Sequence, residues 1–248
     1  MAARPIFALL SVIFTAGAIV LIILTLLAGA IDSSATNKVY FLQAATSGIA
    51  NAPPTSRWTF WNYCSSDSSS AVGLCNGVHP AYPLDPPSGR TFGTTEGVPP
   101  QFIGTRKFFY LTRFMFAFVL IGLFFAVCSL CTGLLALCTR IGAYVSGFLN
   151  MVGLFFQMLT AILMTVAYVQ GRNAFRSNGN NATIGRYAFG FMWAAFACLL
   201  LSTVFFCLAG SKNRNNRDST TSYSSKRSFL GRRSRSTRSR GSLRKDMV

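Results

Sequence analysis

The chain has 248 residues, of which 51% are apolar and only 12% are charged. Ordinary soluble domains carry about 25% charged residues, so this composition excludes that class. The 23 Lys and Arg residues face only 6 Asp and Glu residues and a single His. Because acid–base catalysis and metal binding need such groups, we expect no enzyme, no metal site and no cofactor.

Four long stretches are almost free of charge, and they cover residues 6–31, 114–138, 141–169 and 187–209. Each exceeds the roughly 20 residues with which a helix crosses about 30 Å of hydrocarbon. A backbone in lipid must satisfy its own hydrogen bonds, so stretches of this length are helical. The sequence predicts an all-α membrane protein with four transmembrane helices.

The first stretch leaves two alternatives open. Arg4 and the small residues at 28–30 fit a signal peptide that is cleaved. The apolar run is longer than the roughly 7 to 15 residues of such peptides. We therefore expect it to be retained as the first span.

The Lys and Arg residues that flank the spans predict the orientation. The loop of residues 32–113 is left out, because long loops cross the membrane largely regardless of charge. The predicted outer side then holds Arg172, Arg176 and Arg186, and the cytosolic side holds Arg4, Arg140, Lys212, Arg214, Arg217, Lys226 and Arg227. Both termini are expected in the cytosol, with the sequon Asn181-Ala182-Thr183 outside as a glycosylation candidate.

Asn150 and Gln157 are the amide side chains well inside a predicted span. Small and polar residues recur beside them on one face of the helix, whereas Phe148 and Phe155 lie away from it. Polar side chains in a span mark either a transport site or hydrogen bonds between helices. Without a charged neighbour, the interhelical role is the stronger prediction.

The loop of residues 32–113 has the features of a small extracellular domain. Apolar and aromatic runs at 39–42 and 58–63 indicate short strands, and the proline-rich stretch 80–100 indicates an irregular loop. Cys64 and Cys75 lie in this loop, where an oxidising compartment lets them form a disulfide. We expect that bond to brace the domain.

The pattern Trp58-x-x-Trp61-x-x-Cys64-x10-Cys75, with four spans and a long first loop, resembles the claudin-like tetraspan superfamily. It is most similar to the fungal branch, the SUR/PalI family of plasma-membrane proteins. The resemblance implies a four-helix bundle under a small β-rich cap. We expect Trp58 and Trp61 to be aromatic anchors of the loop core or of the membrane interface. Claudins have Gly-Leu before the second Trp, whereas this chain has Thr59-Phe60, so a claudin-type paracellular pore is not expected.

The last 38 residues carry twelve Lys and Arg against two Asp. Such a serine-rich, basic segment cannot bury enough apolar area to fold, so a disordered cytosolic tail is predicted. Beneath a bilayer, its nearest anions are acidic lipids such as phosphoinositides, and no nucleic acid is expected as a partner. The lipid-binding candidates are Arg232, Arg233, Arg235, Arg238 and Arg240, and the phosphorylation candidates are Ser228, Ser234 and Ser236.

The sequence therefore predicts two units, a claudin-like tetraspan domain over residues 1–210 and the tail over residues 211–248. The resemblance implies a non-enzymatic organiser of eisosome-type plasma-membrane domains, linked to the cell wall, actin and endocytosis. Its partners would be anionic lipids and either further copies of the chain or other cortical membrane proteins. The alternatives are a PalI-type component of ambient-pH signalling and a small channel or transporter.

Overall fold

The computed structural model describes residues 3–30, 38–66, 72–75, 77–136 and 140–211. All of them belong to a compact unit that ends at Ser211. Residues 212–248 of the predicted tail, with its candidate lipid-binding arginines and phosphorylation serines, lie outside the described residues.

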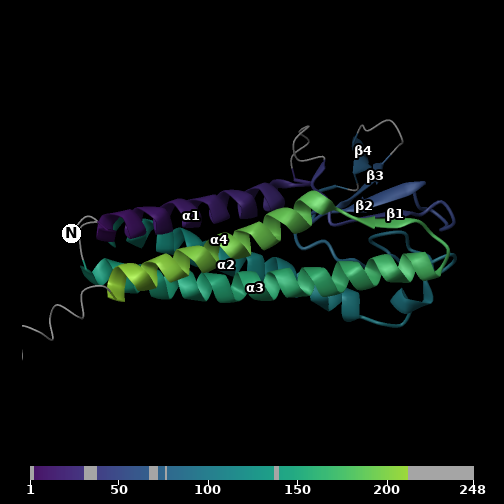
Figure 1. The fold of residues 1–248 in the computed structure, drawn as a ribbon. Helices are drawn as coiled ribbons and strands as arrows, with labels where there is room; N and C mark the ends of the chain where they lie inside the picture. Colours follow the sequence, from purple (N-terminus) through teal and green to yellow (C-terminus); the bar gives the residue numbers. More distant parts are fainter. Residues whose placement is uncertain (1–2, 31–37, 67–71, 76, 137–139, 212–248) are drawn as a thin grey trace, which may run out of the picture. The chain divides into compact units, whose positions relative to one another are not determined.

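Four helices lie side by side (Figure 1), and each is long and apolar enough to cross a membrane. They are α1 (Ala3–Leu27), α2 (Lys107–Ala136), α3 (Arg140–Ser177) and α4 (Arg186–Ser211). The prediction of a four-span helical bundle is confirmed.

The helix boundaries differ from the predicted spans at the end of the bundle nearest the sheet. α1 stops at Leu27 because Gly29 adopts a left-handed conformation with φ of +85°. α2 begins at Lys107 instead of residue 114, and α3 continues to Ser177 instead of residue 169. Hydropathy detects only the segment that needs lipid. The extension of α3 packs against β1 and β5, and the extension of α2 contacts the irregular loop, where Phe108 packs on Phe102.

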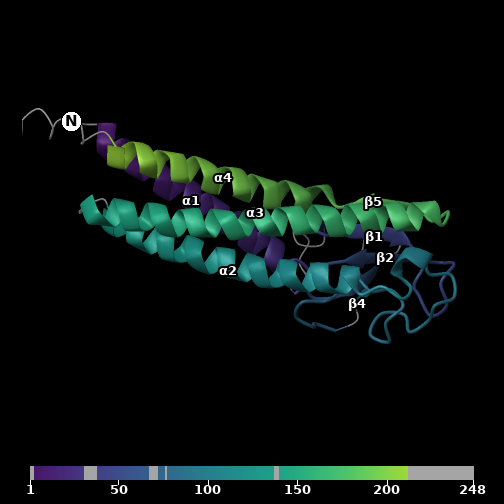
Figure 2. The same cartoon turned by 90° about the horizontal axis from the view of Figure 1, so that it is seen from below.

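A five-stranded antiparallel sheet caps one end of the bundle, as Figure 2 shows from a second direction. Its strands follow the order β4-β3-β2-β1-β5. They are β1 (Leu42–Ala45), β2 (Thr55–Trp58), β3 (Tyr63–Ser66), β4 (Val72–Cys75) and β5 (Ala182–Ile184). We call this sheet and its connecting loops the cap. The predicted β-rich cap is confirmed.

The strands are displaced from the predicted runs. The run 39–42 only reaches the first residue of β1, and the run 58–63 contains the turn between β2 and β3. The proline-rich stretch is irregular as predicted, since its only described regular element is a 3₁₀ turn, η2 (Pro100–Phe102). β5 was not predicted; it follows α3 and pairs with β1 at the sheet edge.

An aromatic core joins the cap to the extended part of α3. Phe41 stacks on Tyr168 with ring centroids 4.9 Å apart, and Trp58 lies 5.7 Å from Phe175. Phe102 of η2 also approaches Phe175, with ring centroids 5.3 Å apart. The buried face of the sheet therefore packs on a helix that continues into the bundle.

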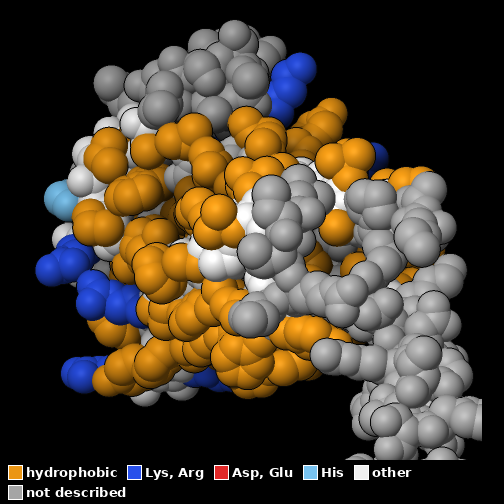
Figure 3. Space-filling model, turned by 90° about the vertical axis from the view of Figure 1, so that its left-hand side faces the viewer, with side chains coloured by type: hydrophobic (Ala, Val, Ile, Leu, Met, Phe, Trp, Pro, Cys, Tyr) orange, Lys and Arg blue, Asp and Glu red, His pale blue; other side chains and the backbone are white. Residues whose placement is uncertain are grey.

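Within the bundle, α2 and α3 approach each other through glycine. A methyl group added to Gly153 would lie 3.3 Å from the backbone nitrogen of Ala126 and 3.4 Å from the carbonyl oxygen of Gly122. Large apolar side chains such as Phe148 and Phe155 are exposed. Figure 3 looks along the bundle and shows hydrophobic side chains over most of the described surface in view. Close helix contacts and an apolar exterior are what a bundle in lipid requires.

Candidate functional site

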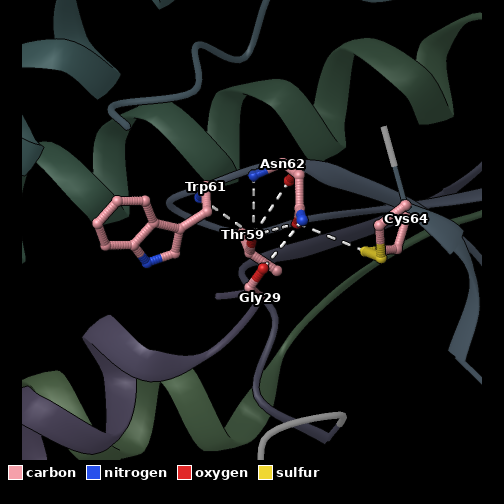
Figure 4. The surroundings of a disulfide bond; sticks show 6 residues. Gly29, Thr59, Trp61, Asn62 and Cys64 are labelled. Atoms are coloured by element: carbon pink, nitrogen blue, oxygen red, sulfur yellow. Dashed lines mark hydrogen bonds between the residues drawn. A yellow bond between two sulfur atoms is a disulfide. The ribbon is translucent and has the colours of Figure 1, made fainter. Parts of the chain in front are cut away.

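The turn between β2 and β3 carries the Trp-x-x-Trp motif, and its shape depends on Thr59 and Asn62. The Thr59 hydroxyl donates to the Asn62 side-chain Oδ1 at 2.9 Å. The same hydroxyl oxygen accepts the backbone N–H groups of Trp61 and Asn62, each at 3.2 Å. One threonine thus closes the turn from inside, as Figure 4 shows, because its hydroxyl both donates and accepts.

This turn is docked on the C-terminal end of α1. The Asn62 amide donates to the Gly29 carbonyl oxygen at 2.9 Å, and the Trp61 indole N–H donates to the Leu26 carbonyl oxygen (Figure 4 shows the Asn62 contact). Carbonyls at the end of a helix have no partner within the helix. The cap therefore supplies side-chain donors to the first helix.

Gly29 is required at this contact for two reasons. Its φ of +85° is unfavourable for residues with a side chain. A methyl group added there would also lie 2.2 Å from the Thr59 hydroxyl oxygen. The helix end and the turn consequently approach more closely than any other residue would allow.

Cys64 and Cys75 form a disulfide with an S–S distance of 2.02 Å, which confirms the predicted pair. It joins β3 to β4 beside the turn, and the Cys64 sulfur lies 3.4 Å from Asn62 Oδ1 (Figure 4). The bond therefore fixes the strand that follows Asn62. It also restricts the chain entropy of the unfolded cap.

The two tryptophans of the motif have different surroundings. Trp58 is 1% exposed and lies between Phe92 and Phe175 in the aromatic core. Its indole N–H has no hydrogen-bond partner among the described atoms. Trp61 is half-buried and packs edge-on against Phe116 of α2. Trp58 thus packs inside the cap, whereas Trp61 contacts two helices.

A group of polar side chains lies inside the bundle around Asn150. We call it the polar cluster, and it consists of Ser11, Thr15, Asn150, Ser202 and Thr203. The Asn150 amide donates to the Leu199 carbonyl oxygen at 3.0 Å and to the Thr203 hydroxyl at 2.8 Å. The Thr15 and Ser202 hydroxyl oxygens are 2.7 Å apart. These bonds connect α1, α3 and α4 at a buried site.

Gln157 lies two turns further along α3 and is also buried. Its amide nitrogen donates to the Met192 carbonyl oxygen of α4 at 3.2 Å. Its side-chain oxygen has no partner among the described atoms. Both predicted amides therefore contact α4, and the described residues contain no group of three or more metal-ligating side chains.

Asn181 is exposed directly before the edge strand β5. Its backbone carbonyl accepts the N–H of Ala45 at 2.7 Å. Thr183, the third residue of the sequon, is exposed as well. The side chains of the sequon are therefore accessible, although its backbone is held in the sheet.

Burial changes the pKa of two groups in the cap. It raises the pKa of the Asp85 carboxyl above 3.8, and the positive charge of Arg106 partly opposes this shift. Burial also raises the pKa of the Tyr63 hydroxyl.

The sequence identified the Trp-x-x-Trp motif and the two buried amides, but not the residues that they contact. Asn62 and Gly29 meet across more than thirty residues of chain, as do Thr15 and Ser202 across a much longer separation. The repeat Ser11-x-x-x-Thr15 was a usable signal, because residues four apart share a helix face. No comparable local signal marks Asn62.

A model of the SUR7/PalI family matches residues 7–205 of the chain. The Candida albicans protein named SUR7 is 41% identical over 201 residues, which cover 80% of this chain and 72% of that protein. Saccharomyces cerevisiae SUR7 is 35% identical, covering 77% and 64% respectively. A S. cerevisiae protein named as an uncharacterized plasma membrane protein, YNL194C, is 30% identical, covering 79% and 65%. For the two S. cerevisiae proteins, the match spans less than two thirds of their length.

Proposed function

Because the chain belongs to the SUR7/PalI family and is a multi-pass membrane protein, we propose that it organises cortical domains of the fungal plasma membrane of the eisosome type. In this role it catalyses no reaction. It links a cap outside the cell, a bundle in lipid and a basic cytosolic tail, and through them the cell wall, actin and endocytosis. The name of one relative as a plasma membrane protein supports this location.

The arrangement of polar groups in the bundle is the observation that carries the proposal. Asn150 directs its amide into α4, and Thr15 and Ser202 bond to each other. Large apolar side chains occupy the exterior instead. Such a bundle is built to be held together tightly and to be embedded among lipids and other proteins.

The disulfide supports the orientation in which the cap lies outside the cell. Disulfides persist in oxidising compartments and are rare in the cytosol. If the bond between Cys64 and Cys75 lies outside, an even number of four spans requires both termini in the cytosol. Asn181 then faces the compartment in which glycosylation occurs.

The tail provides the proposed attachment to the inner leaflet. Each basic residue near an anionic surface contributes about 1 kcal/mol of attraction. A phosphate on Ser228, Ser234 or Ser236 would add negative charge beside an arginine and weaken that attraction. Tail binding to phosphoinositides would thus concentrate the protein where such lipids gather.

Imaging of the full-length chain with a fluorescent tag in living cells tests the proposal. We expect immobile patches at the cell cortex, with slow recovery after photobleaching. A variant with the arginines 232, 233, 235, 238 and 240 changed to glutamine should recover faster. The matched variant with the same five positions changed to lysine keeps the charge and should behave as the native chain. An even distribution of the native chain would refute the proposal.

A further inference from the structure

The face of the sheet that points away from the helices carries a row of polar side chains. Register places Thr183, Gln43, Arg57 and Cys64 directly beside one another across β5, β1, β2 and β3. Directly paired residues point to the same face of a sheet. The alternate residues, such as Leu42, are buried against the helices. The disulfide therefore lies at one end of this row.

Arg57 is held in a fixed position at the centre of the row. Its Nε donates to Gln43 Oε1 at 3.0 Å, and its guanidinium carbon lies 4.9 Å from the centre of the Tyr40 ring. Stacking on an aromatic ring and a hydrogen bond at Nε together fix the plane of the guanidinium. The Arg57 guanidinium is therefore held in one orientation before any ligand binds.

The two terminal nitrogens of the same guanidinium have no partner among the described residues. A guanidinium offers these nitrogens as a planar fork that matches the spacing of oxygens in phosphate or carboxylate. Gln43 and Tyr40 contact the Nε and the face of the group, so neither occupies the fork. The arrangement is that of a receptor for an anion.

The region around Arg57 carries an excess of positive charge. The cap and the adjoining ends of α3 and α4, in described residues 38–66, 72–75, 77–106 and 170–186, contain seven Lys and Arg but only Asp85 and Glu96 as acids. Several of these cations donate to neutral acceptors, such as the Ala182 carbonyl oxygen that accepts from Arg176. An excess of positive charge attracts polyanions and raises their local concentration.

The exposed side chains of the cap favour a sugar polymer over a protein as the source of that anion. Protein interfaces are centred on large aromatic or aliphatic anchors. In residues 38–65 and 77–106, where the exposure of the side chains is described, the exposed large apolar side chains are Val78 and Ile103, and neither lies on a strand. The row of amide, hydroxyl and guanidinium groups offers hydrogen bonds instead.

We infer that Arg57, oriented by Gln43 and Tyr40, binds the phosphate or carboxylate groups of an anionic extracellular polysaccharide. This inference deepens the proposed function, on whose orientation of the cap it rests. The ligand would tether the cap to material outside the cell, opposite the lipid-bound tail. Binding requires no covalent step.

The test uses the full chain in sealed vesicles of a neutral phosphatidylcholine. Vesicles in which added protease leaves the tail intact have the cap outside, and the tail cannot then reach an added polymer. The probes are fluorescent dextran carrying phosphate monoesters, carboxymethyl dextran and unmodified dextran. We expect the charged dextrans to bind and the unmodified dextran not to bind, with the tighter one identifying the anion.

Arg57→Gln should weaken this binding at least about tenfold, because it removes the charge and the fork together. Arg57→Lys keeps the charge and should give an intermediate affinity. Arg106→Gln is the matched control, because it removes one charge from the same cap away from the sheet, and it should stay within about twofold of native. Unchanged melting temperatures would show that the variants fold.

Two results would overturn the inference. Equal losses in Arg57→Gln and Arg106→Gln would mean general attraction by the charged cap and no site at Arg57. Absence of binding to either charged dextran would rule out the ligand class. The protease treatment tests separately whether the cap and the tail lie on opposite sides of the bilayer, so that arrangement could hold while polymer binding fails. Patch formation in cells would likewise be unaffected by such a failure.

Discussion

Replacement of Asn62 by alanine tests the contact between the cap and α1 most directly. The change removes the donor to the Gly29 carbonyl oxygen and the acceptor of the Thr59 hydroxyl, two bonds of 2.9 Å each. Asn62 is only 2% exposed, so water cannot easily replace the lost partners. The turn would retain the bonds that Thr59 makes to the backbone of Trp61.

The magnitude follows from the number of bonds. A neutral hydrogen bond contributes about 1 kcal/mol to stability, and a buried group left without a partner adds to the loss. Two bonds therefore predict a loss of at least about 2 kcal/mol. For a protein of this size, that loss lowers the melting temperature by about 4 to 8 °C.

The assay is thermal unfolding of the purified full chain in lipid nanodiscs. Asn180→Ala is the matched control, because Asn180 is a half-buried amide between α3 and β5 whose side chain makes no hydrogen bond to the residues that the structure describes. Asn62→Asp keeps the acceptor for Thr59 but loses the donor, so its melting temperature should fall as well. If Asn62→Ala unfolds at the same temperature as Asn180→Ala, the docking of the turn on α1 contributes nothing and the reasoning is wrong.

Three further predictions concern the disulfide, the polar cluster and the cap. Cys64 and Cys75 are separated by 11 residues, so changing both to serine should lower the free energy of unfolding by about 3 kcal/mol through chain entropy. A reducing agent should lower the melting temperature of the native chain but not that of this variant. Asn150→Leu removes two hydrogen bonds to α4, so at roughly 0.6 kcal/mol per bond it should lower the free energy of unfolding by about 1 kcal/mol. Phe148 is exposed, and Phe148→Leu should leave the melting temperature unchanged in the same assay. Because the pKa of Asp85 is raised in the folded chain, its folded form binds the proton more tightly, so stability should fall as the pH rises above 3.8. Asp85→Asn should therefore unfold at a higher temperature than native near neutral pH, and a lower temperature would contradict the burial assigned to this carboxyl.

The sequence predicted the spans because lipid imposes one simple requirement on them, a long uncharged run. It did not predict how far α3 extends, since the residues after 169 are no longer selected by lipid. Phe175 belongs to that extension, and its place in the helix depends on contacts with Trp58 and Phe102. Such contacts join segments that are distant in the chain, so no local pattern records them.

The Trp-x-x-Trp motif and the disulfide were predicted, but the contacts of the motif were not, because they join residues that are distant in the chain. Trp61 and Cys64 are conspicuous by residue type, and the disulfide followed from two cysteines in one loop. The function of Asn62 depends on Gly29, which terminates a helix far away in sequence. β5 is only three residues long and exists because β1 offers it an edge. Strands of this length carry too little periodicity to be read from sequence.

The polar cluster also weighs against a transport pathway through the bundle. An ion in such a path would have to be solvated by the groups that now bond to one another. The Asn150 amide already donates to Leu199 and Thr203, while the Ser202 hydroxyl contacts Thr15 and the Ser11 carbonyl oxygen. Each bond broken to admit an ion would leave a buried polar group unpaired or require it to turn towards the ion. The same groups, left as they are, hold three helices together, and a rigid bundle keeps the cap in a fixed position relative to the opposite end of the helices.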